Sequence, residues 1–166
     1  MGSIKFIPSA DASVVSARSR SILSSILDSA GLASCVVTST VRSPASQARA
    51  MFVNLEATSV QKQLGLYGQP GKKVIREYER LKSAGHGKQT IQDAMEAKIL
   101  ALGPGTVSRH CADPAQLNVV DIAPSSIANR DAFMNALDEA LAAGDISKYL
   151  SPINGDPAFH VEIPQG

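Results

Sequence analysis

The sequence has few aromatic residues and almost no net charge. Its 166 residues include three tyrosines, four phenylalanines and no tryptophan, which excludes an extensive aromatic platform for stacking nucleic-acid bases or sugar rings. Sixteen Lys and Arg stand against fifteen Asp and Glu, giving a formal charge of +1. That balance lacks the basic excess that favours duplex nucleic acid or an anionic membrane. We therefore expect neither nucleic acid nor membrane insertion.

Cysteines and long apolar runs are also scarce. Cys35 and Cys111 form no Cys-x-x-Cys pair, which excludes a cysteine-rich zinc module and a disulfide-dense scaffold and leaves a single disulfide open. No apolar run approaches the roughly 18 residues of a membrane span, and the first residues lack the apolar core of a signal peptide. We expect synthesis in the cytoplasm without a signal peptide, and action on the cell wall only after release by lysis or a secretion system.

The composition that is present fits one globular domain over residues 1–166. Hydrophobic residues make up 44% of the chain, enough for an aliphatic core, and we expect a monomer. Apolar periodicity, β-branched runs and helix caps predict these elements: a helix at 9–30, a strand at 34–41, a helix at 44–55, a strand at 118–122, a helix at 130–143 and a strand at 158–163.

The middle of the chain carries much of the Lys and Glu and predicts a helical insert at about 58–102. Its helices are expected at 74–81 and 90–102, and Gly103-Pro104-Gly105 should end the second one. A loop or short strand is expected at 106–110. Strands interspersed with helices, without a regular β-α-β alternation, favour the α+β class, with a small antiparallel sheet packed with helices.

Two histidines and an aspartate are candidate metal ligands. A hydrolytic zinc ion takes three nitrogen or oxygen ligands from the protein and keeps one position open for water. His110, Asp121 and His160 satisfy that count, and they belong to segments that a sheet can bring together. On the residues alone, the alternative is that both histidines are ordinary hydrogen-bonded residues.

Four ordered blocks strengthen the metal hypothesis. They are Val37-Thr38-Ser39-Thr40-Val41-Arg42-Ser43-Pro44-Ala45-Ser46-Gln47, Ser108-Arg109-His110, Val119-Val120-Asp121-Ile122 and Phe159-His160-Val161-Glu162. In this order they resemble the zinc D-alanyl-D-alanine carboxypeptidase and dipeptidase family, which includes phage endolysins and shares a fold with the hedgehog signalling domain. The resemblance extends over nearly the whole chain, from about residue 34 to residue 163.

The resemblance implies a function and roles for particular residues. His110, Asp121 and His160 would bind Zn²⁺, Arg42 would face the substrate carbonyl or carboxylate, and Ser108 would support the site. The expected activity is that of a zinc metallopeptidase that hydrolyses an amide bond in the stem peptide of peptidoglycan, as an endolysin or antibacterial effector. The alternatives are a non-catalytic metal- or peptide-binding module of the same fold and a D-Ala-D-Ala dipeptidase.

The chain departs from the family pattern before and between the ligands. Ten residues separate His110 from Asp121, where the family has six, so an insertion within 111–117 is expected. That spacing makes Asp113 a rival ligand, although the apolar setting of Asp121 matches the family better. Thr40-Val41 replaces the Gly-Tyr that often precedes the family arginine.

The acid/base group is a third departure. The family often has a glutamate three residues before the last histidine, where this chain has Pro157. Two nearby acids could carry the proton instead. We choose Asp156, because it lies in a turn and directly precedes proline. Glu162 is the competing choice, or it orients His160 from the same strand face.

A cysteine-peptidase reading of His110-Cys111 is disfavoured. Adjacent strand residues point to opposite faces, so the two side chains would be badly placed to share a proton.

Overall fold

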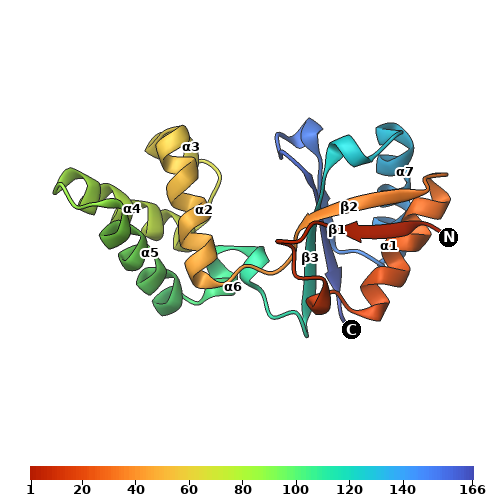
Figure 1. Ribbon diagram of the computed structural model, residues 1–166, viewed down its shortest axis with the longest axis horizontal. Helices are drawn as coiled ribbons and strands as arrows, with labels where there is room; N and C mark the ends of the chain where they lie inside the picture. Colours follow the sequence, from red (N-terminus) through yellow and green to blue (C-terminus); the bar gives the residue numbers. More distant parts are fainter. The chain divides into compact units, whose positions relative to one another are not determined.

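The computed structural model describes every residue from Met1 to Gly166, and the chain forms two compact units. The first comprises Met1–Val41 and Asp113–Gly166, and the second comprises Arg42–Ala112. The molecule belongs to the α+β class, with seven α-helices and one five-stranded sheet (Figure 1). None of the helices is both long enough and apolar enough to cross a membrane.

The first unit holds the sheet, and its strands follow the order β1-β2-β3-β5-β4. Their bounds are β1 Ser3–Phe6, β2 Ser34–Ser39, β3 Leu117–Ile122, β4 Lys148–Leu150 and β5 Phe159–Pro164. β1 pairs with β2 in parallel, and the other neighbours are antiparallel. The sheet is therefore mixed, and the expectation of a purely antiparallel sheet is wrong. The parallel pair arises because helix α1 connects β1 to β2, as such a crossover requires.

Helices α1 (Ala17–Ser29) and α7 (Arg130–Ala143) contact each other and share the hydrophobic core of the first unit. Ser16 caps α1 by accepting a hydrogen bond from the backbone N–H of Ser19, and Gly144 ends α7 in the left-handed conformation that glycine favours. Short 3₁₀ turns complete the unit: η1 Ala12–Val14, η3 Pro124–Ser126 and η4 Pro152–Asn154.

Side-chain alternation separates the two faces of the sheet. In β5, the side chains of Phe159, Val161 and Ile163 are fully buried in the core shared with α1 and α7. His160 and Glu162 therefore project from the opposite face, because successive strand residues point to opposite sides. The polar residues of β5 are thus placed together by the same alternation that buries its apolar residues.

The second unit is entirely helical. It contains α2 Pro44–Ala57, α3 Val60–Leu64, α4 Gln69–Ser83, α5 Lys88–Leu102, α6 Pro104–Val107 and the 3₁₀ turn η2 Arg109–Cys111. Met51 and Phe52 of α2 share one core with Ile75 of α4 and Met95 of α5. The helical region is consequently wider than the expected insert at about 58–102, because α2 packs with α4 and α5.

Most predicted elements are confirmed within a few residues, the first helix is shorter than expected, and one element is wrong. The expected helix at 9–30 begins only at Ala17, where the Ser16 cap allows it. The expected loop or short strand at 106–110 is helical instead, divided between α6 and η2. Gly103 adopts a φ of 95°, so the chain turns there and starts a new helix at Pro104, whose fixed φ suits a first helical position.

Candidate metal centre

The pairing of β3 with β5 sets Asp121 directly opposite His160. Oδ1 of Asp121 lies 3.1 Å from Nδ1 of His160, and Oε2 of Glu162 lies 2.9 Å from Nε2 of the same ring. Glu162 is two residues along the strand from His160, so both side chains leave the same face. One imidazole is thereby held between two carboxylates, one across the sheet and one along its own strand.

This environment favours the protonated form of His160. Burial alone would lower the pKa of the ring, but the hydrogen bonds to Asp121 and Glu162, together with their negative charges, outweigh it and raise the pKa to about 9. Both ring nitrogens face carboxylate oxygens, and each oxygen accepts a hydrogen bond only from a nitrogen that carries a proton. Without a metal ion, the raised pKa therefore favours the imidazolium form near neutral pH.

The sheet is irregular next to Asp121. The pairing of β2 with β3 shifts between Val37 and Ser39, so that Val37 lies opposite Ile122 and Ser39 lies opposite Asp121. The register shift re-aims side chains locally, as β-bulges beside functional sites do. Thr38, the extra residue, donates from its hydroxyl to the backbone oxygen of Asp121 at 3.4 Å.

His110 lies in η2, near the point where the chain returns from the helical unit to the sheet. Its backbone N–H donates to the Ser108 hydroxyl at 3.3 Å, and its carbonyl accepts from the backbone N–H of Arg42 at 2.7 Å. Ser108 therefore supports the site through the backbone at His110. These contacts fix both backbone groups of His110.

One potential ligand atom from each of His110, Asp121 and His160 lies within 4.8 Å of the other two. Both histidines are buried and Asp121 is half-buried. Atoms bound to one tetrahedral zinc ion at about 2.1 Å lie about 3.4 Å apart, so the three ligand atoms would draw closer together on binding an ion. Two imidazoles and one carboxylate form a donor set that zinc accepts.

Asp113 and Asp156 are not members of this group. The Asp113 carboxylate is exposed and accepts from the backbone N–H of Ala115, closing a local turn within the expected insertion. The Asp156 carboxylate does the same with Ala158 at 2.9 Å, in the loop that leads into β5. The structure thus brings Asp121, not its rival Asp113, to the histidines.

Arg42 lies just after β2, half-buried among residues of the helical unit. Its Nη1 donates to Oε1 of Gln47 at 3.4 Å, and Nε2 of Gln47 in turn lies 3.5 Å from the Tyr67 hydroxyl. Burial raises the pKa of Tyr67, and the nearby Arg42 charge partly offsets that effect. Backbone contact with His110 and side-chain contact with Gln47 hold Arg42 next to a proposed ligand.

Tyr67 is the neighbour that the sequence did not single out. Tyr67 lies in the loop between α3 and α4, and its ring packs against Gly71 in the first turn of α4. A Cβ atom on Gly71 would clash with the ring and Cβ atom of Tyr67, because two carbon atoms cannot approach so closely. Gly71 is therefore the residue that lets the Tyr67 ring reach Gln47.

The two cysteines are free thiols. Burial raises the pKa of Cys111, and Arg42 offsets part of that shift. The thiol form, which is a poor nucleophile, is therefore favoured. His110 and Cys111 occupy a 3₁₀ turn and not the expected strand, so strand geometry does not keep the two side chains apart. The raised pKa of the Cys111 thiol disfavours a cysteine peptidase instead.

Comparison with known proteins finds no matching family model, no matching curated protein and no matching solved structure.

Proposed function

We propose that the protein is a zinc metallopeptidase of the hedgehog/DD-peptidase type that cleaves an amide bond in the peptide part of peptidoglycan. One observation carries this proposal. His110, Asp121 and His160, which the family resemblance selects from three separate segments, have ligand atoms within 4.8 Å of one another. The surrounding hydrogen bonds agree with the roles that the resemblance implies.

His160 would bind the ion through Nδ1, which faces Asp121, while Nε2–H donates to Glu162. A carboxylate behind a ligating imidazole fixes its tautomer and orientation. Glu162 is then a positioning residue, and its buried side chain is engaged by the ring. A bound zinc ion would lower the pKa of its water to about 7 and polarise the scissile carbonyl.

Arg42 would hold the substrate. Its guanidinium is fixed by Gln47 near the backbone of His110, and a fixed, planar cation can bind a peptide carboxylate or the oxyanion of an attacked amide. Asp156 would carry the proton to the leaving amine. Its turn precedes β5, and only one of its oxygens is engaged by Ala158.

The decisive test is the release of peptide fragments from purified peptidoglycan sacculi by zinc-loaded protein, with and without a chelator. The proposal predicts new amino termini or released D-alanine that disappear with the chelator. Zinc binding without any cleavage would contradict catalysis and would favour the binding module. Cleavage of free D-Ala-D-Ala without any action on sacculi would identify a dipeptidase instead.

A further inference from the structure

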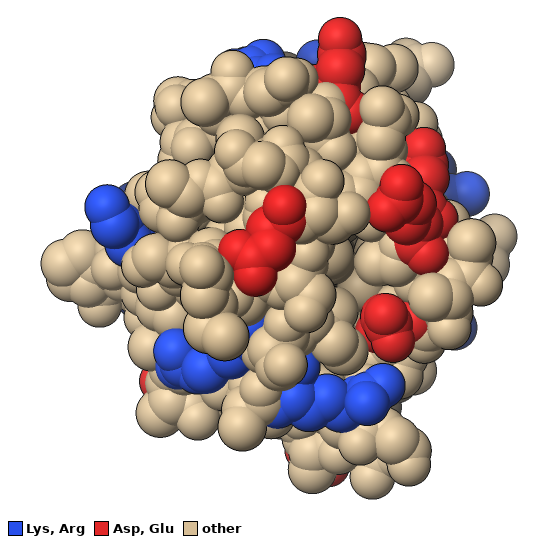
Figure 2. Space-filling model, turned by 90° about the vertical axis from the view of Figure 1, so that its right-hand side faces the viewer, with Lys and Arg blue, Asp and Glu red and all other residues tan.

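Charge is divided unequally between the two units. The helical unit, Arg42–Ala112, carries eleven Lys and Arg against five Asp and Glu, a net charge of +6. The first unit carries five against ten, a net charge of −5. On the side that bears α1 and the N-terminus, Figure 2 shows Asp and Glu in several separate groups and Lys and Arg in a band. The overall charge of +1 conceals a strongly basic module.

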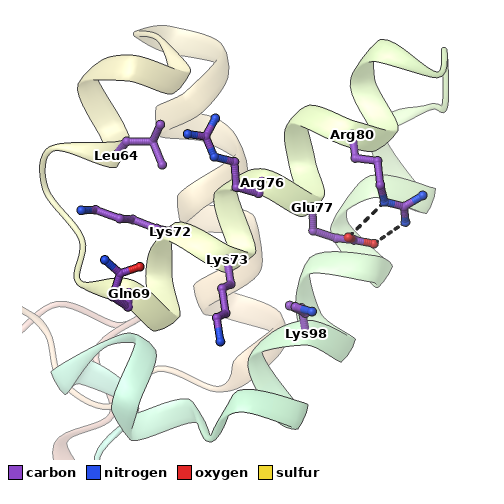
Figure 3. A pocket seen from close by; sticks show the side chains of 8 residues that line it. All are labelled: Leu64, Gln69, Lys72, Lys73, Arg76, Glu77, Arg80 and Lys98. Atoms are coloured by element: carbon purple, nitrogen blue, oxygen red, sulfur yellow. Dashed lines mark hydrogen bonds and ion pairs between the residues drawn. The ribbon is translucent and has the colours of Figure 1, made fainter.

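Five of the eleven basic residues of this unit line a groove of about 390 Å³ along α4. Its lining, drawn in Figure 3, consists of Leu64 of α3, Lys98 of α5 and six residues of α4: Gln69, Lys72, Lys73, Arg76, Glu77 and Arg80. Figure 3 shows the cationic side chains of α4 leaving the helix in different directions, with Lys72 and Arg76 on the side of Leu64 and Lys73 on the side of Lys98. Five cationic side chains and one anionic side chain therefore line the groove.

The single anion is already paired. Glu77 forms an ion pair with Arg80 at 2.6 Å, and Arg76 pairs with Glu79 at 2.9 Å. The three lysines of the groove, Lys72, Lys73 and Lys98, form no ion pair. Their positive charge is therefore available to a ligand.

The arrangement is unfavourable for α4 by itself. Lys72, Arg76 and Arg80 follow one another at a spacing of four residues, where like charges repel. The first turn of α4 has no acidic residue and no side-chain cap, and Lys72 and Lys73 come directly after it, although cations destabilise the positive end of a helix. A bound anion would relieve both effects.

The lining indicates the kind of anion. The cations extend from Lys72 to Arg80, which spans about 12 Å at 1.5 Å per residue, and this is longer than one phosphate group. No aromatic residue lines the groove, so it offers no stacking surface for bases. Lysine and arginine both bind phosphate oxygens well. We propose that the groove along α4 binds a linear phosphate polymer that carries no bases.

This proposal is independent of the peptidase proposal, because none of the metal-centre residues lines the groove. The test measures binding of the full-length chain to fluorescently labelled inorganic polyphosphate as a function of salt concentration. Lys72→Gln combined with Lys73→Gln should weaken binding at least tenfold and lower the salt slope by about two, roughly one for each phosphate contact.

The matched control combines Lys62→Gln with Lys88→Gln. Both lysines are exposed, belong to the helical unit and lie outside the groove, so the change in net charge is the same. This control should bind within about twofold of the wild type, and circular dichroism should show the same helix content in all three proteins. Equal weakening in both double variants, or no polyphosphate binding at low salt, would overturn the proposal.

A second arm uses single-stranded DNA with the same number of phosphates. The proposal predicts that DNA binds no more tightly than polyphosphate, since only the backbone phosphates would contact the groove. Tighter binding of DNA would show that bases contribute, and would overturn the proposal in favour of nucleic acid.

Discussion

His160 is the residue on which the metal centre depends. Nδ1 of His160 faces Oδ1 of Asp121. In the protonated ring this nitrogen carries a proton at the position from which it would otherwise donate its lone pair to an ion. A metal ion and this proton therefore exclude each other, while the bond from Nε2 to Glu162 serves both states. The same two carboxylates that keep the ring charged also prepare it as a ligand.

The stability of the metal-free protein should depend on pH through His160. The folded-state pKa of about 9 lies above the ordinary value of 6.5, so the folded state holds this proton more tightly than the unfolded state. The stabilisation is complete below about pH 6.5 and is lost as the pH rises through about 9. Urea unfolding of chelator-treated protein across this range should show the decline, and His160→Gln should flatten it. An equally steep decline in that variant would assign the effect to other groups.

Substitution of Arg42 by lysine should separate substrate binding from metal binding. We expect Arg42→Lys to keep its zinc but to lose about a hundredfold in turnover, the scale of losing one oxyanion donor, because an ammonium cannot reproduce the planar fork. Arg49→Lys, on an exposed position of α2, is the matched control and should be as active as the wild type. Near wild-type turnover in Arg42→Lys would show that the Arg42 guanidinium does not act on the substrate.

Asp156 and Glu162 should give different defects. Asp156→Asn keeps an oxygen that can accept from Ala158, so it should fold, bind zinc and lose turnover. Glu162→Gln should weaken zinc binding by about 10- to 100-fold, as removal of a ligand-orienting carboxylate does, and should recover turnover when zinc is added. Loss of turnover at saturating zinc only in Glu162→Gln would make Glu162 the proton carrier and contradict the choice of Asp156.

At the scale of elements, α4 combines a tight contact with its basic groove. Gly71→Ala would ordinarily stabilise a helix interior by up to about 1 kcal/mol. Here its Cβ would meet the Tyr67 ring, so we expect a destabilisation of about 1–3 kcal/mol. Urea unfolding measures the difference. Gly65→Ala, whose Cβ would have only ordinary contacts, is the control, and a stabilised Gly71→Ala protein would contradict the packing described for Tyr67.

Elements with strong local signals were predictable from the sequence. Ser43 and Pro44 start α2 as a cap and a first helical residue, and Gly144 ends α7. β1 and β4 escaped prediction because strands of four and three residues show too little alternation and owe their existence to sheet pairing. The 3₁₀ turn at Arg109–Cys111 also escaped prediction. It depends on the turn at Gly103 and on the cap at Ser108.

The candidate site was predictable only in part. The period of two placed Glu162 on the same strand face as His160, and the structure gives that pair a hydrogen bond. The register that sets Asp121 opposite His160 depends on the whole sheet, and no local pattern specifies it. Tyr67 was missed because its contact with Gln47 joins residues that are 20 positions apart in the sequence. The basic groove was missed because a net charge summed over the whole chain hides the positive charge of one unit.

At the scale of the whole molecule, the chain joins an acidic sheet unit to a basic helical unit. The central claim is that His110, Asp121 and His160 hold one metal ion, and the peptidase proposal depends on it.

The most direct test of this claim is the zinc content of the purified chain after zinc loading and removal of excess metal. We predict about one zinc ion per wild-type chain, and a large loss in His110→Ala and in His160→Ala, because two remaining ligands hold zinc poorly. His86→Ala, which removes the exposed third histidine, should retain the metal. One zinc ion per chain in both ligand variants would contradict the assignment.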